Sequence, residues 1–292
     1  MLFQSMIDLH THSTASDGIL SPSALMEYAH SKNITTIALS DHDTLKGLAE
    51  AEKKANELGI NFIPACEFSI EWPTGEFHLL GYGLDTPSQS LLDVLTYIHN
   101  RRMECSEQTA QKLRDQGFDI SLEEVCREFN TRSPGRPHFA DLLVKKGYFK
   151  ERQTVFDRYL AKGRKCYVPR HGADLKQTVN AIKESCGIPV IAHPMSLYVS
   201  WGKLEGVMTS IKDAGVMGLE AWHPAIRYSQ AQRLEKLAEK LGMFVTAGSD
   251  FHGEKVRKDR HIGYTAGKIK IDDRFYNNEL YPALQKAGFS TI

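Results

Sequence analysis

The segment Asp8-Leu9-His10-Thr11-His12 lies near the start of the chain, in a run that predicts a β-strand at Met6–Thr11. Side chains two residues apart share one face of a strand, so Asp8, His10 and His12 lie together and the apolar residues between them face the other way. Two imidazoles in this arrangement can reach one metal ion. Histidines on strands are often only hydrogen-bonded surface residues, so this pair needs support from the rest of the chain.

Six further short apolar runs support a metal site, because each contains or is followed by a side chain that can bind a metal ion. The expected strands are Thr36–Ser40, Asn61–Pro64, Phe77–Tyr82, Pro189–Ala192, Gly218–Trp222 and Met243–Ala247. The candidate side chains are Asp17, Asp41, His42, Asp43, Glu67, His78, His193, Glu220, His223, Asp250 and His252. Parallel barrels build their active sites at the carboxyl ends of successive strands. Since buried carboxylates and imidazoles are costly without cations, the pattern predicts a metal centre there.

Helical patterns separate these runs, which indicates repeated strand–helix units and an α/β fold with a parallel sheet or barrel. Helix starts are marked by Ser21 with Pro22 and by Asp174, and glycines fall where helices should end. The expected helices include Leu45–Leu58, Leu175–Cys186, Leu204–Ala214 and Gln230–Leu241, with Gly59, Gly187, Gly215 and Gly242 near their ends or just before the next strand.

The alternation of strand and helix patterns stops at residues 99–170, where the patterns are helical and no strand is expected. We therefore predict a barrel formed by residues 1–98 and 171–292, with an inserted helical domain at 99–170 that recognises the substrate. The insert holds 16 Lys and Arg against 10 Asp and Glu, a net charge of +6 in a chain that is neutral overall. A basic insert beside a carboxylate-rich metal centre suggests an anionic ligand, although a solvated helical face would give the same excess.

The composition excludes several other classes of protein. No apolar run approaches the roughly 18 residues of a membrane span, and the N-terminus lacks the features of a signal peptide. The five cysteines are widely spaced without a CxxC pair, so we expect them to be reduced. The expected location is the cytoplasm, and no feature indicates a membrane or an obligate protein partner.

Mixed histidine and carboxylate ligation without thiolates suits Mn²⁺, Fe²⁺ or Zn²⁺, and a shared carboxylate such as Glu67 can bridge two ions. Adjacent ions about 3.5–4 Å apart clamp a phosphoryl group and stabilise the attacking and leaving oxygens together. Hydrolysis of a phosphate ester is therefore the expected reaction.

Five motifs in order resemble the PHP (polymerase and histidinol phosphatase) superfamily, and they cover about 220 residues on both sides of the insert. They are Asp8–Ser13, Ser16-Asp17-Gly18, Ser40–Asp43, His193-Pro194 and Gly248–His252. The resemblance implies a distorted (β/α)₇ barrel with three metal ions, Mn²⁺ foremost. It assigns His10, His12, Glu67 and Asp250 to one ion, Glu67, His78 and His193 to the second, and Asp17, His42 and His252 to the third. Asp8 then orients a histidine, and Ala65 replaces a glycine that many relatives have.

The insert narrows the resemblance to bacterial 3′,5′-nucleoside bisphosphate phosphatases, which also act as 5′-to-3′ exoribonucleases on short RNAs. The matching phosphate-recognition residues are Arg101, Arg102, Ser133, Arg136 and His138. The resemblance therefore implies a nucleotide bisphosphate or short RNA as the substrate. Arginine forks bind phosphate oxygens bidentately, which gives a physical reason for these residue types.

The expected catalytic residues are His10, His12, Glu67 and Asp250, with His223 or a water molecule as proton donor to the leaving oxygen. Three alternatives stay open. A histidinol phosphatase would leave the basic insert unexplained, and a proofreading nuclease of the superfamily would need a polymerase. A non-catalytic metal-binding or RNA-binding module would bind its ligand without turnover.

Overall fold

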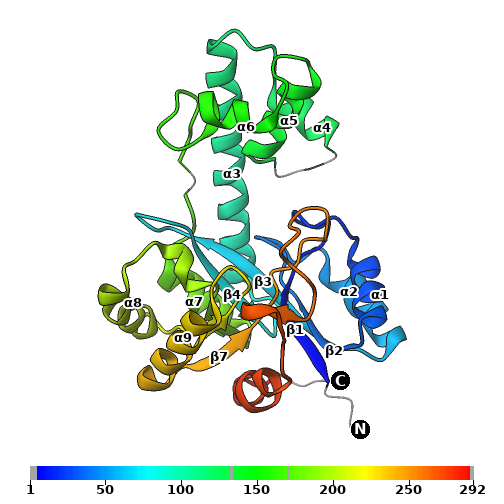
Figure 1. Cartoon of the computed structure of the whole chain (residues 1–292), viewed down its shortest axis with the longest axis vertical. Coiled ribbons are helices and arrows are strands. Elements are labelled where there is room, and N and C mark those ends of the chain that lie inside the picture. The colour runs from blue at the N-terminus through cyan, green and yellow to red at the C-terminus, as the bar shows by residue number, and fades with distance from the viewer. Residues whose placement is uncertain (1–4, 130, 132–133, 170, 290–292) are drawn as a thin grey trace. The chain divides into compact units, whose positions relative to one another are not determined.

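The fold is built around one seven-stranded sheet whose spatial order follows the chain, and Figure 1 shows helices arranged around it. The structure is a computed structural model of the chain and describes residues 5–129, 131, 134–169 and 171–289. The strands are β1 (Met6–Thr11), β2 (Ile34–Leu39), β3 (Asn61–Ile70), β4 (Phe77–Tyr82), β5 (Ile188–Ile191), β6 (Gly218–Trp222) and β7 (Phe244–Ala247). All seven predicted strands are confirmed, with β1, β4 and β6 at the predicted bounds.

One expectation about the sheet is wrong, because β4 runs antiparallel to both of its neighbours, β3 and β5. β3 continues to Ile70, beyond the predicted end at Pro64, and forms a hairpin with β4. In this hairpin Ser69 pairs with His78. His78 is the second residue of β4, so the reversed strand brings its amino end to the edge where the parallel strands have their carboxyl ends.

The two outer strands of the sheet also approach each other. Thr11 at the end of β1 forms a parallel bridge with Phe251, which follows β7. The His12 N–H donates to the Phe251 carbonyl at 2.9 Å. The mixed sheet therefore curves toward the distorted barrel that was predicted, with ligand-type residues of β1 and β7 on adjoining segments.

Helices cover the sheet between its strands, and the sequence marks several of their ends. They are α1 (Pro22–Ser31), α2 (Leu48–Leu58), α7 (Leu175–Glu184), α8 (Trp201–Asp213) and α9 (Tyr228–Leu241). Ser21 and Asp174 cap α1 and α7 as predicted, since their side chains accept backbone N–H bonds. Gly59 and Gly242 end their helices in the left-handed conformation, whereas after α7 it is Cys186, with φ of 57°, that takes this conformation.

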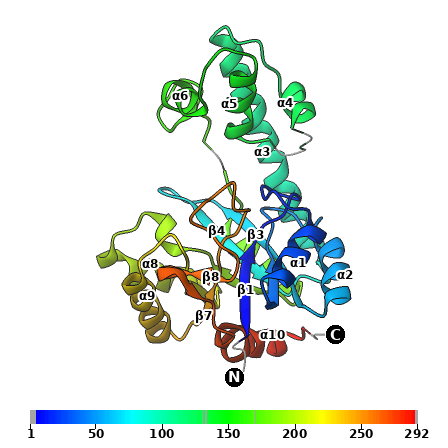
Figure 2. The same ribbon diagram turned by 45° about the vertical axis from the view of Figure 1, so that its right-hand side comes forward.

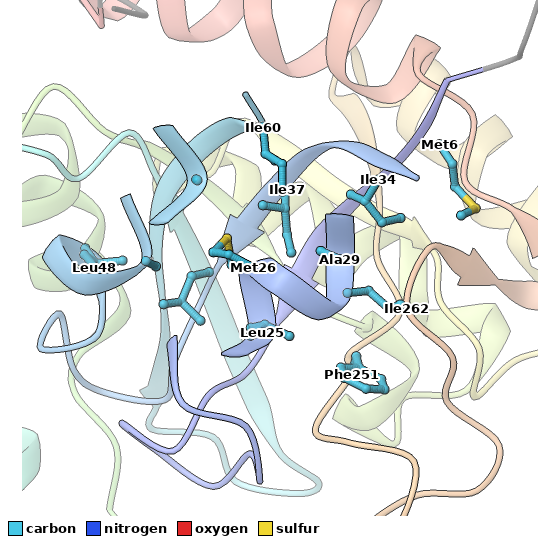
Figure 3. Close-up of a cluster of buried hydrophobic side chains, with 13 residues drawn as sticks. Met6, Leu25, Met26, Ala29, Ile34, Ile37, Leu48, Ile60, Phe251 and Ile262 are labelled. Atoms are coloured by element: carbon cyan, nitrogen blue, oxygen red, sulfur yellow. The ribbon is translucent and has the colours of Figure 1, made fainter. Parts of the chain in front are cut away.

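The apolar faces of the first two helices close one side of the sheet. Figures 1 and 2 show α1 and α2 side by side, and Figure 1 shows them next to β2. Leu25 and Met26 of α1 are fully buried with Ile37 of β2, and Phe251 joins the same cluster (Figure 3). This packing fixes the segment that carries Asp250 and His252 against the β1 end of the sheet.

Chain contacts divide the protein into two compact units, residues 1–95 with 173–292 and residues 96–172. The long helix α3 (Gln89–Asp115) runs from the first unit into the second. The second unit adds α4 (Leu122–Glu128), α5 (Arg136–Lys145), α6 (Arg152–Val155) and the π-helix η1 (Phe156–Leu160), and its described residues form no strand. Its own core centres on Leu113, Phe139 and Leu143.

Short elements complete the first unit: η2 (Pro194–Leu197), β8 (Tyr264–Thr265), η3 (Ala266–Lys268), β9 (Ile269–Lys270), η4 (Phe275–Leu280) and α10 (Tyr281–Ala287). Among the described residues, no helix combines the length and the apolar character that crossing a membrane requires.

Candidate metal centre

Glu67 of β3 lies at the centre of the candidate site and is fully buried. Its two carboxylate oxygens face different histidines. Oε1 lies 2.8 Å from His193 Nε2 and 3.0 Å from His78 Nδ1. Oε2 lies 3.2 Å from His10 Nε2, 3.3 Å from His12 Nε2 and 3.1 Å from His42 Nδ1. One carboxylate therefore contacts five histidines, which come from four strands or strand ends.

Three groups of side chains bring ligand atoms within 4.8 Å of one another. They are His10, His12, Glu67 and Asp250; His12, Asp17, His42 and His252; and His42, Glu67 and His78. The first group has the membership implied by the family resemblance. The second adds His12 to the implied set, and the third contains His42 where His193 was implied, although His193 also contacts Glu67.

Buried polar atoms without hydrogen bonds indicate that these groups fit cations. Among the described residues, the buried atoms without a hydrogen-bond partner include His12 Nδ1, Glu67 Oε2 and His78 Nδ1. His10 Nε2 and His12 Nε2 lie 3.1 Å apart, so at most one of them can hold the proton between them. Divalent cations would use these lone pairs and offset the carboxylate charge.

The ionisable groups of the site strongly shift one another's pKa values. Burial lowers the pKa of His10, but the Glu220 and Glu67 carboxylates outweigh it and hold that pKa well above its usual range. Burial lowers the pKa of His12, but the nearby Asp250 and Glu67 carboxylates outweigh it and raise that pKa to about 10. Burial raises the pKa of Glu67, yet the surrounding histidines bring it well below its usual value.

Glu220 of β6 orients two candidate ligands, a role that the sequence did not reveal. Its Oε1 lies 2.9 Å from His10 Nδ1, and its Oε2 accepts the backbone N–H of His193 at 2.8 Å. The His193 backbone has an unusual φ of 26°, which this bond supports. Strand spacing marked Glu220 only as a candidate ligand, since its contacts lie 210 and 27 residues away in the chain.

Asp8 contacts a candidate ligand, His10, through its backbone N–H rather than through its ring. Its carboxylate accepts backbone N–H bonds from His10 at 3.2 Å, Ser249 at 3.0 Å and Gly263 at 2.7 Å, and the Ser249 hydroxyl at 2.5 Å. Burial raises its pKa to about 6 against the effect of these donors. Asp8 therefore ties β1 to the segment that follows β7.

Replacing Glu220 with Gln is expected to weaken metal binding by about 10- to 100-fold, the usual cost of losing a carboxylate behind a ligating histidine. Titration with Mn²⁺ followed by calorimetry measures the change. Glu239→Gln on the exposed side of α9 is the matched control. Equal affinities in both variants would contradict the orienting role.

Asp41 holds the loop that carries Asp17. It does so through hydrogen bonds and does not face the other candidate metal ligands. Asp41 accepts the Ser13 N–H at 2.8 Å and the hydroxyls of Ser13 and Ser16 at 2.6 Å. Asp17 in turn reaches His252, with Oδ1 at 3.1 Å from Nε2. Asp43 accepts bonds from Ser69 instead. Of the Asp41–Asp43 motif, only His42 faces the other candidate ligands.

His223 lies beside the first group, with its Nε2 at 3.2 Å from Asp250 Oδ2. The same nitrogen lies 2.7 Å from Nη1 of Arg260, a buried arginine that the sequence gave no reason to single out. Burial lowers the pKa of His223 despite the nearby Asp250 carboxylate. His223 thus belongs to the site although it is outside the three groups.

The predicted phosphate-recognition residues lie in the second unit and are only partly grouped. Arg102 and Arg136 line one small pocket, together with Cys105, Ser106, Thr109, Pro134, Gly135, Phe139 and Val168. Arg101 is engaged with Glu104 at 2.5 Å and is absent from that lining. His138 Nδ1 accepts the Gly135 N–H at 3.0 Å, which caps α5. Ser133 lies outside the described residues.

Comparisons with known proteins agree with this fold. The profile of the PHP domain matches residues 8–176. A 3′,5′-nucleoside bisphosphate phosphatase from Chromobacterium violaceum is 32% identical over 89% of this chain and 91% of its own. The 5′-3′ exoribonuclease Rnm from Escherichia coli is 31% identical, with 84% of each chain covered. A solved structure described as an amidohydrolase from Chromobacterium violaceum superimposes with a TM-score of 0.80 at 30% identity, covering 97% of both chains.

Proposed function

The chain belongs to the PHP domain family, and on that premise we propose that it is a metal-dependent phosphoesterase that removes the 3′-phosphate of nucleoside 3′,5′-bisphosphates. On short 5′-phosphorylated RNA the same centre would release nucleotides from the 5′ end. The observation that carries the proposal is the buried Glu67 carboxylate, which faces five histidines with its two oxygens. The names of the relatives support the substrate class.

We propose that the centre holds three divalent ions, preferably Mn²⁺, bound by the three groups of side chains together with His193. When bound, such ions activate water for attack and neutralise charge on phosphoryl oxygens. Glu67 holds the groups together, Glu220 keeps the His10 ring oriented, and Asp41 keeps the Asp17 loop in place. Because these contacts are already formed, the site would need little reorganisation to bind a phosphate ester.

The inserted unit is proposed to bind the second phosphate of the substrate. The pocket lined by Arg102 and Arg136 offers two guanidinium groups, with the amino end of α5 beside them at Gly135. Guanidinium forks and helix amino ends both favour phosphate.

A substrate panel tests the proposal. Purified protein with Mn²⁺ is given adenosine 3′,5′-bisphosphate, histidinol phosphate, AMP or a short 5′-phosphorylated RNA, and the released phosphate and nucleotides are measured. We expect the highest kcat/KM for the bisphosphate and nucleotide release from the RNA 5′ end. Preferred hydrolysis of histidinol phosphate would refute the proposed substrate, and binding without turnover would refute the enzyme.

Arg136→Ala is expected to raise KM for the bisphosphate by about 10- to 100-fold, the range for losing a hydrogen bond from a charged group. KM for a monophosphate should change little. Arg158→Ala, at an exposed arginine of the same unit, is the control. Arg136 also donates to the Leu160 carbonyl at 3.3 Å, so equal effects on both substrates would identify it as structural.

A further inference from the structure

Tyr198 is the most exposed large hydrophobic residue in the part of the chain that the structure describes, with 80% of its surface accessible. Its backbone has φ of 54° and ψ of 37°, a left-handed conformation that is unfavourable for a bulky residue. A single exposed tyrosine needs no explanation by itself. A tyrosine that is both exposed and held in a strained conformation suggests a function.

The segment that carries Tyr198 is fixed to the turn between β3 and β4. The carbonyl of the preceding residue, Leu197, accepts hydrogen bonds from Thr74 Oγ1 at 2.8 Å and from Trp72 Nε1 at 3.3 Å. Strained backbone persists only where its surroundings hold it in place. These two bonds supply that support immediately before the tyrosine.

The Tyr198 ring lies against the same turn, at Gly75. A Cβ atom added at residue 75 would lie 2.7 Å from Tyr198 Cδ2 and 1.9 Å from the Ser196 carbonyl oxygen. Only glycine therefore allows the turn to approach the tyrosine this closely. The ring has backbone support on one side, while most of the residue is open to a flat ligand.

Tyr198 also lies at the rim of the metal centre, because it follows a candidate ligand. His193 faces Glu67 through Nε2, and its Nδ1 lies 3.0 Å from Ser196 Oγ. The 3₁₀-helix η2 connects His193 to Tyr198, and at about 2 Å of rise per residue it spans roughly 10 Å. A group attached to a phosphate at the metal centre can therefore reach this rim.

The chemistry of the rim suits a nucleobase better than a second phosphate. Residues 71–76 contain two glutamates and no lysine or arginine, so the turn would repel a phosphate. Every nucleobase has a π face that can stack on an aromatic side chain, whatever the identity of the base. An exposed, supported tyrosine beside an anionic turn therefore fits a neutral, flat base.

We propose that Tyr198 is a specificity-determining residue, which stacks on the base of the nucleotide whose 3′-phosphate is hydrolysed. The proposal rests on the proposed function for the reaction, but the contact itself rests on the packing of the turn. Stacking adds affinity without reading hydrogen-bonding groups. The bisphosphates of adenosine, guanosine, cytidine and uridine should therefore all be substrates, whereas a sugar bisphosphate without a base should bind more weakly.

Calorimetry in the presence of Mn²⁺ tests the contact without turnover, by comparing AMP with ribose 5-phosphate. We expect the unaltered protein to bind AMP about 5- to 150-fold more tightly, the range for stacking one base on an aromatic side chain. Tyr198→Ala should remove this preference, and Tyr198→Phe, which keeps the ring, should retain it. Equal affinities of the unaltered protein for the two ligands would overturn the proposal, as would an absence of AMP binding or a preference that survives in Tyr198→Ala.

Kinetics supply the second measurement. Tyr198→Ala should raise KM for adenosine 3′,5′-bisphosphate by the same factor and keep kcat within about two-fold, because stacking contributes equally to the ground state and the transition state. KM for the base-free analogue 1-deoxyribose 3,5-bisphosphate should not change. Tyr198→Gly removes the ring and suits the left-handed backbone, so it serves as the folded variant if the alanine protein is unstable.

A fall in kcat on both substrates would show that Tyr198 acts by placing His193, and it would overturn the stacking role. The proposed function fails separately, if the unaltered protein hydrolyses no phosphate ester. In that case the comparison of AMP with ribose 5-phosphate still decides whether Tyr198 binds a base.

Discussion

Glu67→Gln is expected to reduce phosphate release by about 10³-fold or more. The substitution keeps the size of the side chain but removes the charge shared by His10, His42 and His78. Metal centres supply several kcal/mol of charge stabilisation to the transition state, and about 4 kcal/mol corresponds to that factor. The loss should be large because one carboxylate serves two groups of candidate ligands at once.

Elemental analysis of the same variant separates metal loss from a purely catalytic defect. We expect fewer bound ions per chain in Glu67→Gln, because both of its oxygens face ligand atoms. Glu52→Gln, on the exposed face of α2, provides the control for loss of one negative charge. Full metal content together with full activity would show that Glu67 bridges nothing.

The positions of the strands could be read from the sequence, but the direction of β4 could not. Period-two patterns and apolar runs are local, so they locate β1, β4 and β6 without information from the rest of the fold. Strand direction depends on the connection. Ending β3 at Pro64 left a gap long enough for a crossover, whereas the strand continues to Ile70 and leaves only a hairpin turn before Phe77.

The same difference between local patterns and long-range contacts explains which site residues the sequence revealed and which roles it did not. Ligand-type residues at strand ends are visible because the barrel brings all those ends to one face. The roles of Glu220 and Arg260 depend on which side chains meet across distant segments, such as His10 with Glu220 and His223 with Arg260. The sequence marked Glu220 only as a candidate ligand, and an arginine in a polar loop looks ordinary until its partner is known.

Metal binding is expected to stabilise the barrel strongly against heat. The site buries Glu67, Asp250 and several histidines together, and an ion that binds only the folded state adds its binding free energy to stability. A concentration about 1,000 times Kd contributes about 4 kcal/mol. At about 2–4 °C per kcal/mol for a unit of this size, Mn²⁺ should raise Tm of the stripped protein by roughly 8–16 °C.

The three tryptophans of the chain allow this shift to be measured in the barrel alone. Trp72, Trp201 and Trp222 all lie in the unit formed by residues 1–95 and 173–292, so their fluorescence follows the unfolding of that unit. The Tm gain should be much smaller in Glu67→Gln, because its ligand groups lose their shared carboxylate, and unchanged in Glu52→Gln. An equal Tm gain in the unaltered protein and in both variants would show that the stabilising ions bind elsewhere. Binding at the proposed centre should weaken when Glu67 is replaced.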